Sequence, residues 1–242
     1  MLNYKKNASR TVNSRSAFTL IELSIVLIII GLLVAGITGG AALINAAKLR
    51  SVMTDANANK IAANNFYSQY AALPGDFDKA TGTGAAGDKD GLIDIGSATT
   101  LDEVHNAFNQ LVDTGIISTD ITLSGASATG HVALTPGTDI PQQKDYSGLG
   151  FIFVGENSEN FVLGTGATTV AATTAIADAG GAIFKGEDAL AIDAKMDDGT
   201  MTTGDVRGFN GVAKDATATT CSYSDSDIVC TVGWKLDIPT DI

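Results

Sequence analysis

The sequence predicts an α+β protein in which one long N-terminal helix precedes a head built on an antiparallel sheet. Three observations predict this arrangement. An uncharged, largely apolar run covers residues 23–47, apolar residues then recur at helical spacing as far as Pro74-Gly75, and apolar residues alternate with mostly polar ones over residues 228–238. Spacings of three and four residues indicate a helix with one buried face, whereas a spacing of two indicates a half-buried strand.

Composition limits the class of protein further. The chain has 242 residues, 45% of them hydrophobic, so it can bury a core and is not disordered throughout. Its net charge is −12, yet the first 17 residues hold four basic side chains and no acid, so the remainder carries −16. We therefore expect no nucleic-acid partner, because phosphate binding depends on clustered Lys and Arg.

The apolar run is long enough to cross a membrane. Its 25 residues would extend about 37 Å as a helix, against about 30 Å for the hydrocarbon core of a bilayer. Four basic residues precede the run and Lys48, Arg50 and Lys60 follow it, a slight excess that favours a cytoplasmic N-terminus. We expect one helix over residues 18–72, with a membrane-spanning part at residues 18–45, and an extracytoplasmic head at residues 73–242.

The second half of this helix is predicted to lie on the head. Apolar and aromatic side chains recur there at spacings of three and four, with an interruption at Asn59 and Lys60, and Pro74-Gly75 ends the pattern. The residues are Leu49, Val52, Met53, Ala56, Ala63, Phe66, Tyr67 and Tyr70.

Three interpretations of the N-terminal segment remain open. It is a secretory signal peptide cleaved near Leu43, or a plain single-pass anchor, or a processing site of a third kind. The third rests on residues 16–23, with the sequence SAFTLIEL, where the basic leader meets the apolar run. This segment resembles the processing site of type IV prepilins and pseudopilins, and the chain departs from the family pattern by Ala17 in place of Gly and by Gly39 in place of Pro.

The resemblance implies a pilin-like fold and a definite maturation. Prepilin peptidase would remove residues 1–17 by cutting between Ala17 and Phe18, and Phe18 would then be N-methylated. Glu22 would become the fifth mature residue and pair with the Phe18 amine of a neighbouring subunit. Alternatively, Glu22 lies in the headgroup region, where water and the positive end of the helix tolerate a carboxylate.

The family also implies partners and a location. The chain would be a structural subunit that enters the bacterial inner membrane as a precursor and polymerises with like subunits into a periplasmic or surface filament. Its partners would include an inner-membrane assembly platform with its ATPase. The alternative is a membrane-tethered or secreted head that binds calcium or adheres to a surface without polymerising.

The head is predicted from local patterns. Thr100 and Glu103 form a capping box that opens a helix ending at Gly115. The apolar runs 151–154 and 161–163 predict a hairpin, and residues 187–196 a short helix. The Ala/Thr/Gly-rich stretch 164–181 is expected to be a loop.

The two cysteines, Cys221 and Cys230, predict a disulfide, because the predicted topology places them in an oxidising compartment. Pilins of this type commonly close a C-terminal loop in this way. Two free thiols or half of a metal site are the alternatives, although neither histidine has a finger-like spacing to the cysteines.

Asp88, Asp90 and Asp94 lie in a Gly-rich segment that resembles the middle of an EF-hand loop. They are candidate Ca²⁺ ligands, and Asp76 or Asp78 would fold back to complete the shell. The alternative is a solvated acidic turn. A second acidic segment, residues 193–199, is interrupted by Lys195 and is consistent with the end of a helix and a turn.

Enzyme motifs are not supported. Residues 82–87 fit the spelling of a dinucleotide-binding loop, but no predicted strand precedes them and an acidic turn follows. The sequence contains no nucleophile elbow, Walker loop or zinc-protease helix. We expect no enzyme activity and no required cofactor; a secreted enzyme would have to remain active after removal of the first 45 residues.

Overall fold

The computed structural model describes residues 18–82, 84–94, 103–118, 133–138, 140–156, 159–166, 168–169, 181–210, 221 and 228–238. Contacts divide the chain into two units, Met1–Ala46 and Ala47–Ile242. The predicted leader, with Ala17, lies outside the described residues.

The predicted long helix is present as α1 (Leu20–Tyr70), an unbroken α-helix of 51 residues. Neither Gly39-Gly40 nor Asn59-Lys60 interrupts it. It ends two residues before the predicted boundary, because Ala71 takes a left-handed conformation with φ of 51°. The sequence pattern therefore predicted the existence of the helix correctly and its end to within two residues.

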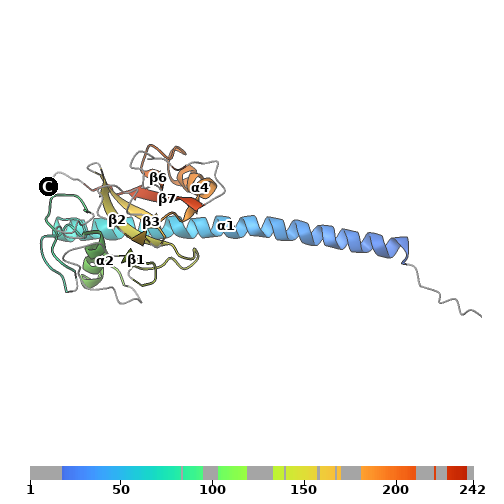
Figure 1. Ribbon diagram of the computed structural model, residues 1–242, viewed down its shortest axis with the longest axis horizontal. Helices are drawn as coiled ribbons and strands as arrows, with labels where there is room; N and C mark the ends of the chain where they lie inside the picture. The colour runs from blue at the N-terminus through green and yellow to red at the C-terminus, as the bar shows by residue number, and fades with distance from the viewer. Residues whose placement is uncertain are drawn as a thin grey trace, which may run out of the picture. The chain divides into compact units, whose positions relative to one another are not determined.

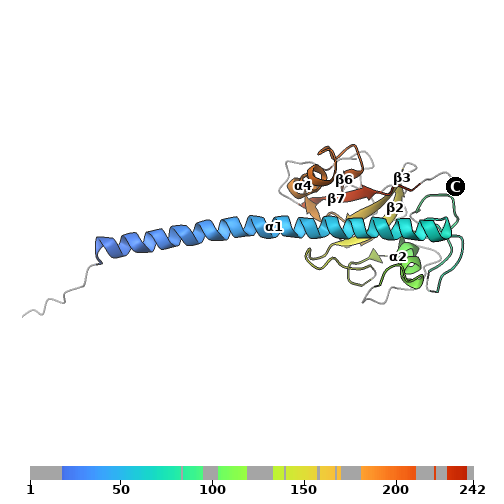
Figure 2. The same cartoon turned by 180° about the vertical axis from the view of Figure 1, so that it is seen from behind.

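The part of α1 within the second unit is amphipathic and runs along the sheet (Figures 1 and 2). Its buried side chains join the same apolar core as the strands. They are Leu49, Val52, Ala56, Ala62, Ala63 and Phe66. Phe66 also meets the ring of Phe77 edge-on at 5.7 Å, beyond the end of the helix. Burial of this stripe fixes which face of the helix meets the head.

The head is built on a five-stranded antiparallel sheet. The order is β2-β3-β7-β5, and β6 also pairs with β7. The strands are β2 (Gly150–Glu156), β3 (Glu159–Thr165), β5 (Phe184–Lys185), β6 (Val206–Asn210) and β7 (Ile228–Lys235). A separate two-stranded sheet pairs β1 (Ala133–Leu134) with β4 (Thr168–Thr169). The α+β class and the hairpin β2–β3 are as the sequence predicts.

Two short helices pack on the sheet. Helix α2 (Glu103–Asp113) packs on β2, where the rings of Phe108 and Phe153 lie 5.1 Å apart. Helix α4 (Gly186–Met196) packs on β5, β6 and β7 (Figure 1), and the indole nitrogen of Trp234 lies 3.1 Å from Met196 Sδ. Both helices were predicted, although Thr100, the residue expected to cap α2, lies outside the described part of the chain.

Two sequence expectations need correction, and one strand was not expected. The stretch 164–181 is not all loop, since Gly164 belongs to β3 and Thr168–Thr169 to β4. Strand β7 stops at Lys235 rather than reaching residue 238, yet Leu236 and Ile238 stay buried, and for this reason the alternation continued past the strand. Strand β6 was not predicted at all.

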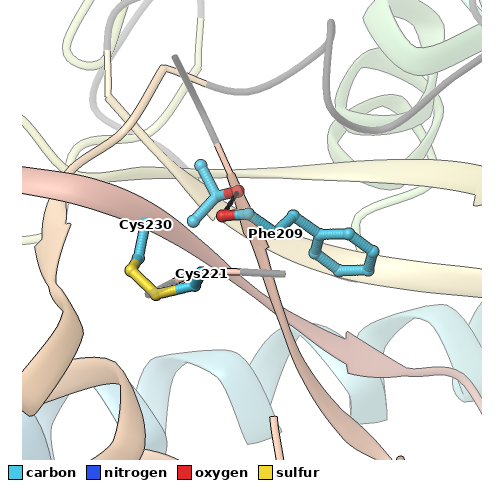
Figure 3. Close-up of a disulfide and its surroundings, with 4 residues drawn as sticks. Phe209, Cys221 and Cys230 are labelled. Atoms are coloured by element: carbon cyan, nitrogen blue, oxygen red, sulfur yellow. Dashed lines mark hydrogen bonds between the residues drawn. A yellow bond between two sulfur atoms is a disulfide. The ribbon is translucent and has the colours of Figure 1, made fainter. Parts of the chain in front are cut away.

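The predicted disulfide joins Cys221 to Cys230 and lies beside β6 and β7 (Figure 3). Both cysteines are buried. Next to it in β7, the hydroxyl of Thr231 donates a 3.3 Å hydrogen bond to the carbonyl oxygen of Phe209 in β6 (Figure 3). The disulfide therefore ties residue 221 to the central strand of the sheet.

A glycine in β7 lets side chains from the strands on either side of it meet. Gly233 pairs with Leu163 of β3 and with Arg207 of β6. Across it, the rings of Phe161 and Phe209 meet edge-on at 5.8 Å. A Cβ atom at Gly233 would lie 2.8 Å from the Phe209 ring, so the close approach requires glycine at this position.

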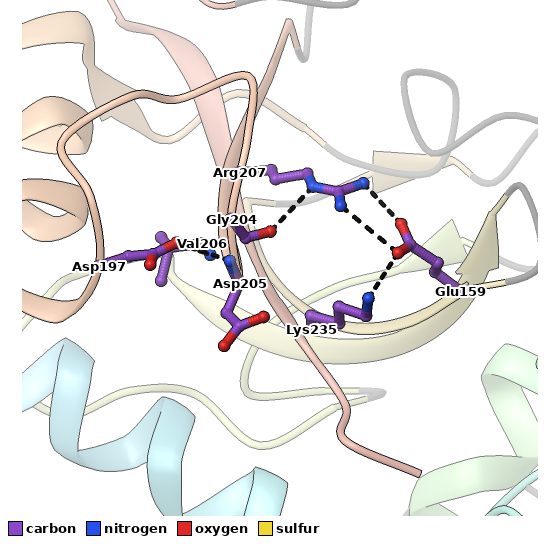
Figure 4. Close-up of polar contacts among 7 residues, drawn as sticks. All are labelled: Glu159, Asp197, Gly204, Asp205, Val206, Arg207 and Lys235. Atoms are coloured by element: carbon purple, nitrogen blue, oxygen red, sulfur yellow. Dashed lines mark hydrogen bonds and ion pairs between the residues drawn. The ribbon is translucent and has the colours of Figure 1, made fainter. Parts of the chain in front are cut away.

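Glu159 holds the same three strands together by charge (Figure 4). Its carboxylate accepts a 2.6 Å bond from Arg207 Nη1 and another of 2.6 Å from Lys235 Nζ. The Arg207 guanidinium also lies 5.4 Å from the centre of the Phe161 ring. Hydrogen bonding from Lys235 and Arg207 lowers the pKa of Glu159 below its usual value.

Candidate functional site

The start of α1 is closed by a reciprocal pair of hydrogen bonds between Thr19 and Glu22. The Thr19 backbone N–H donates to Glu22 Oε2 at 2.8 Å, and the Glu22 N–H donates to Thr19 Oγ1 at 3.3 Å. The Thr19 hydroxyl donates a further bond of 2.8 Å to the same Oε2. This geometry is a capping box, in which a helix satisfies two of its own unpaired backbone donors.

Glu22 thus has a role within its own chain that the sequence analysis missed. The signal was present, because Thr19 and Glu22 have the spacing of a capping box, the same spacing that predicted a helix start at Thr100 and Glu103. The backbone N–H and the hydroxyl of Thr19 both donate to Glu22 Oε2. The other carboxylate oxygen, Oε1, accepts no hydrogen bond from the described residues. One carboxylate oxygen is therefore left for a donor from another molecule.

The first unit presents apolar surface that no described residue covers. Seventeen large apolar side chains of the described chain are exposed, and sixteen of them lie between Phe18 and Ile44. Phe18 itself is 87% exposed. In α1 an 18-residue window with a mean hydropathy of 2.8 has none of its residues buried. By length and composition this is the one described helix able to cross a membrane, and an exposed apolar surface of this extent is typical of a segment that contacts lipid or another protein.

In the head, two buried acids fold around the segment with the predicted calcium ligands. We name Asp76 and Glu103 the acidic clasp. Asp76 accepts the backbone N–H groups of Asp90 and Gly91, both at 3.0 Å. Glu103 accepts those of Asp88 at 3.0 Å and Asp94 at 2.9 Å. Both carboxylates therefore bind the backbone of the loop.

The backbone around Asp76 packs tightly against the start of α2, where Glu103 lies. Gly75, with φ of +99°, lies against the start of α2, where an added Cβ would be 2.4 Å from the carbonyl oxygen of Glu103. Burial, with some help from nearby carboxylates, raises the pKa of Asp76 to about 6 and that of Glu103 to about 8. At neutral pH, Glu103 therefore keeps its proton in a large part of the folded population.

The predicted calcium ligands are only partly brought together. Carboxylate oxygens of Asp88, Asp76 and Glu103 lie within 4.8 Å of one another, whereas Asp90 and Asp94 are not part of that group. Asp76 does fold back onto the loop, as expected. Asp90 Oδ1 accepts the Leu92 N–H at 2.9 Å, a local turn contact. Calcium binding at Asp88, Asp90 and Asp94 stays a prediction.

A second acidic group lies where α4 ends. Asp193, Asp197 and Asp198 offer carboxylate oxygens within 4.8 Å of one another. Asp193 is fully buried, and within the described part of the chain neither of its carboxylate oxygens has a hydrogen-bond partner. Burial and the charges of Asp198 and Asp197 raise its pKa to about 6. The sequence favoured the first acidic segment, but the buried acid without partners is in the second.

The comparisons bear on the N-terminal segment alone. No curated protein and no solved structure matches the chain. A family model does match it over residues 12–38 and describes a structural motif, not an enzyme family. The match begins before Phe18 and ends at residue 38, within the exposed apolar part of α1 that continues to Ile44. Residues 12–38 carry the prokaryotic N-terminal methylation motif, the prepilin signature of type IV pilins and pseudopilins.

Proposed function

We propose that this protein is a structural subunit of a type IV pilus or of a filament like the type II secretion pseudopilus. The observation that carries the proposal is that the methylation motif coincides with the part of α1 whose large apolar side chains, from Leu20 to Ile44, are all exposed. The precursor enters the inner membrane with its N-terminus in the cytoplasm. Prepilin peptidase cuts between Ala17 and Phe18 and the new amine is methylated.

Polymerisation follows from the same surface. The exposed side chains around α1 leave the lipid and pack against helices of like subunits, aided by an assembly platform with its ATPase. The filament then lies in the periplasm or on the cell surface. This exchange keeps the apolar area out of water in both states, so van der Waals packing and polar contacts decide the register.

Glu22 is the polar contact that we assign to register. Its Oε2 is engaged by Thr19, whereas Oε1 is open to the methylated amine of Phe18 in a neighbouring subunit. A carboxylate near the centre of a bilayer costs about 2.5–3.5 kcal/mol on insertion scales, so a matching charge from the next subunit favours the assembled state. The capping and register roles use different oxygens and are compatible.

Paired substitutions separate the two roles. Thr19→Ala removes the capping hydroxyl and keeps the Glu22 carboxylate, whereas Glu22→Ala removes both roles. We expect Glu22→Ala to be processed and membrane-inserted but to yield no sheared filaments, and Thr19→Ala to yield filaments close to wild type. Equal filament loss in the two variants would assign Glu22 to capping alone. Filaments from Glu22→Ala at wild-type yield would contradict the register role.

A filament subunit and a tethered head that never polymerises would be found in different places. A tethered calcium-binding or adhesive protein would stay with the membrane fraction or appear as a released monomer. Electron microscopy of sheared material, labelled with an antibody to the head, reports the difference. Labelled filaments support the proposal, and label confined to membranes or monomers contradicts it.

A further inference from the structure

The last turn of α4 contains a buried negative charge, that of Asp193, which nothing in the described chain balances. Asp193 has no exposed surface, and neither Oδ1 nor Oδ2 has a hydrogen-bond partner among the described residues. The ion pairs among the described residues involve none of Asp193, Asp197 and Asp198. A buried carboxylate without a partner is strongly destabilising, so such groups in folded proteins are paired or bind a cation.

The two neighbouring acids are held in place by the loop itself. Asp197 Oδ2 accepts the N–H groups of Asp205 at 2.6 Å and Val206 at 3.0 Å (Figure 4). Asp198 accepts the Thr200 N–H at 2.7 Å and the Thr203 hydroxyl at 2.8 Å. These neutral donors orient the two carboxylates without cancelling their charge, so three acids with oxygens within 4.8 Å face one another.

The position of the Asp197 carboxylate depends on a glycine in the same loop. Gly204, with φ of +80°, packs so closely on the loop that an added Cβ would lie 1.9 Å from Asp197 Oδ2. Any side chain at this position would displace the Asp197 carboxylate, and the left-handed conformation is itself strained for other residues. The loop is therefore closed around its acids by backbone geometry as well as by hydrogen bonds.

We propose that Asp193, Asp197 and Asp198 bind a divalent cation, and that the cation is Ca²⁺. The ligands are carboxylate oxygens alone, with no sulfur or imidazole in the group, a set that favours a hard cation over zinc or copper. Ca²⁺ accepts irregular oxygen shells completed by water, whereas Mg²⁺ requires a near-octahedral one. The inference does not depend on the proposed function and is distinct from the loop with Asp88, Asp90 and Asp94.

Thermal unfolding of the full chain in detergent, first stripped with EGTA, tests the site. At calcium about 100 times Kd we expect Tm to rise by about 5–10 °C, and by much less with magnesium. Asp193→Asn has nearly the same shape but lacks the charge. We expect it to melt at or above the wild-type Tm in EGTA and to lose the calcium-dependent rise. Asp88→Asn is the matched control and should retain that rise.

Luminescence gives a second readout that does not depend on stability. Trp234 is the single tryptophan, and its indole nitrogen lies 3.1 Å from the sulfur of Met196, the residue before Asp197. Terbium bound at the site should therefore emit when the indole is excited, and added calcium should quench that emission. We expect Asp193→Asn to lower terbium affinity about tenfold or more, as loss of a charged ligand does.

Three results would overturn the proposal. They are a wild-type Tm that calcium does not change, a calcium-dependent rise that survives in both Asp193→Asn and Asp88→Asn, and a rise lost in Asp88→Asn but kept in Asp193→Asn. The last result would place the ion in the acidic clasp loop instead. None of them would affect the proposed filament function, which is tested at the N-terminus.

Discussion

Glu159 offers a quantitative test of what holds the sheet together. Its side chain is 25% exposed, and its carboxylate receives bonds of 2.6 Å from both Arg207 and Lys235, whose side chains are 30% and 32% exposed. It thereby joins β3 to β7 and β6. Hydrogen bonds to a charged group contribute about 1.5–3 kcal/mol each, but partial exposure and rehydration of the freed cations reduce the loss. We expect Glu159→Gln to lower the free energy of unfolding by about 1–2 kcal/mol at pH 7.

The pH dependence of this loss identifies its cause. The pKa of Glu159 is lower in the folded state than in the unfolded state, so its contribution is present above the unfolded value of about 4.5 and is lost as the pH falls through the folded value. The difference between wild type and Glu159→Gln should therefore shrink toward zero at acidic pH. Urea titrations at pH 7, 5 and 3, followed by Trp234 fluorescence, measure it, because urea, unlike guanidinium chloride, is uncharged and does not screen the ion pairs.

A weaker ion pair in the same head provides the control. Lys185 and Glu187 lie 3.9 Å apart with side chains 45% and 69% exposed, so Glu187→Gln should leave the unfolding free energy essentially unchanged. A loss in Glu159→Gln no larger than that in Glu187→Gln would refute the reasoning. A loss that persists undiminished at pH 3 would also refute it, because the ion pairs would not be its source.

Three further predictions concern the head. Gly233→Ala places a Cβ 2.8 Å from the Phe209 ring and should lower the free energy of unfolding by about 1–3 kcal/mol; an unchanged denaturation midpoint would contradict this. Phe66→Ala leaves a cavity under α1 and should cost about 3–5 kcal/mol by the same titration, whereas Ile61→Ala, 60% exposed, should cost far less. The pKa values of Asp76 and Glu103 in the folded protein are raised to about 6 and about 8. The protonated acids therefore stabilise the fold fully at a pH below their unfolded-state pKa values near 4, and this stabilisation is lost as the pH rises through their folded-state pKa values. With EGTA present, stability should therefore fall between pH 5 and pH 8, and a rise over that range would contradict the burial of the clasp.

The spacing of apolar residues along the sequence was enough to predict α1 and the β2–β3 hairpin. The apolar run and the stripe from Leu49 to Phe66 indicated α1, and the short runs at 151–154 and 161–163 indicated the β2–β3 hairpin. Strand β6 was not predicted, because its five residues, Val206–Asn210, include glycine and asparagine and show no sustained alternation of apolar and polar side chains. Its pairing with β7 is a tertiary effect that a five-residue pattern does not reveal.

The candidate sites depended on more than pattern. The residues around Phe18 are contiguous, so the methylation motif could be predicted directly. Thr19 and Glu22 also have the spacing of a capping box, but they lie within the processing motif, and the sequence analysis assigned Glu22 to processing and assembly alone. The isolation of Asp193 could not be predicted, because its burial depends on how α4 packs against β5, β6 and β7, and the sequence showed only acids near a helix end.

Determination of the mature N-terminus tests the central claim most directly. Mass spectrometry of the protein from membrane and sheared-surface fractions would identify the first residue and its modification. Our account predicts a chain that begins at N-methylated Phe18, with the filament fraction containing only this form. A chain beginning near Leu43, as after signal-peptide cleavage, or one still carrying Met1 in both fractions would contradict it.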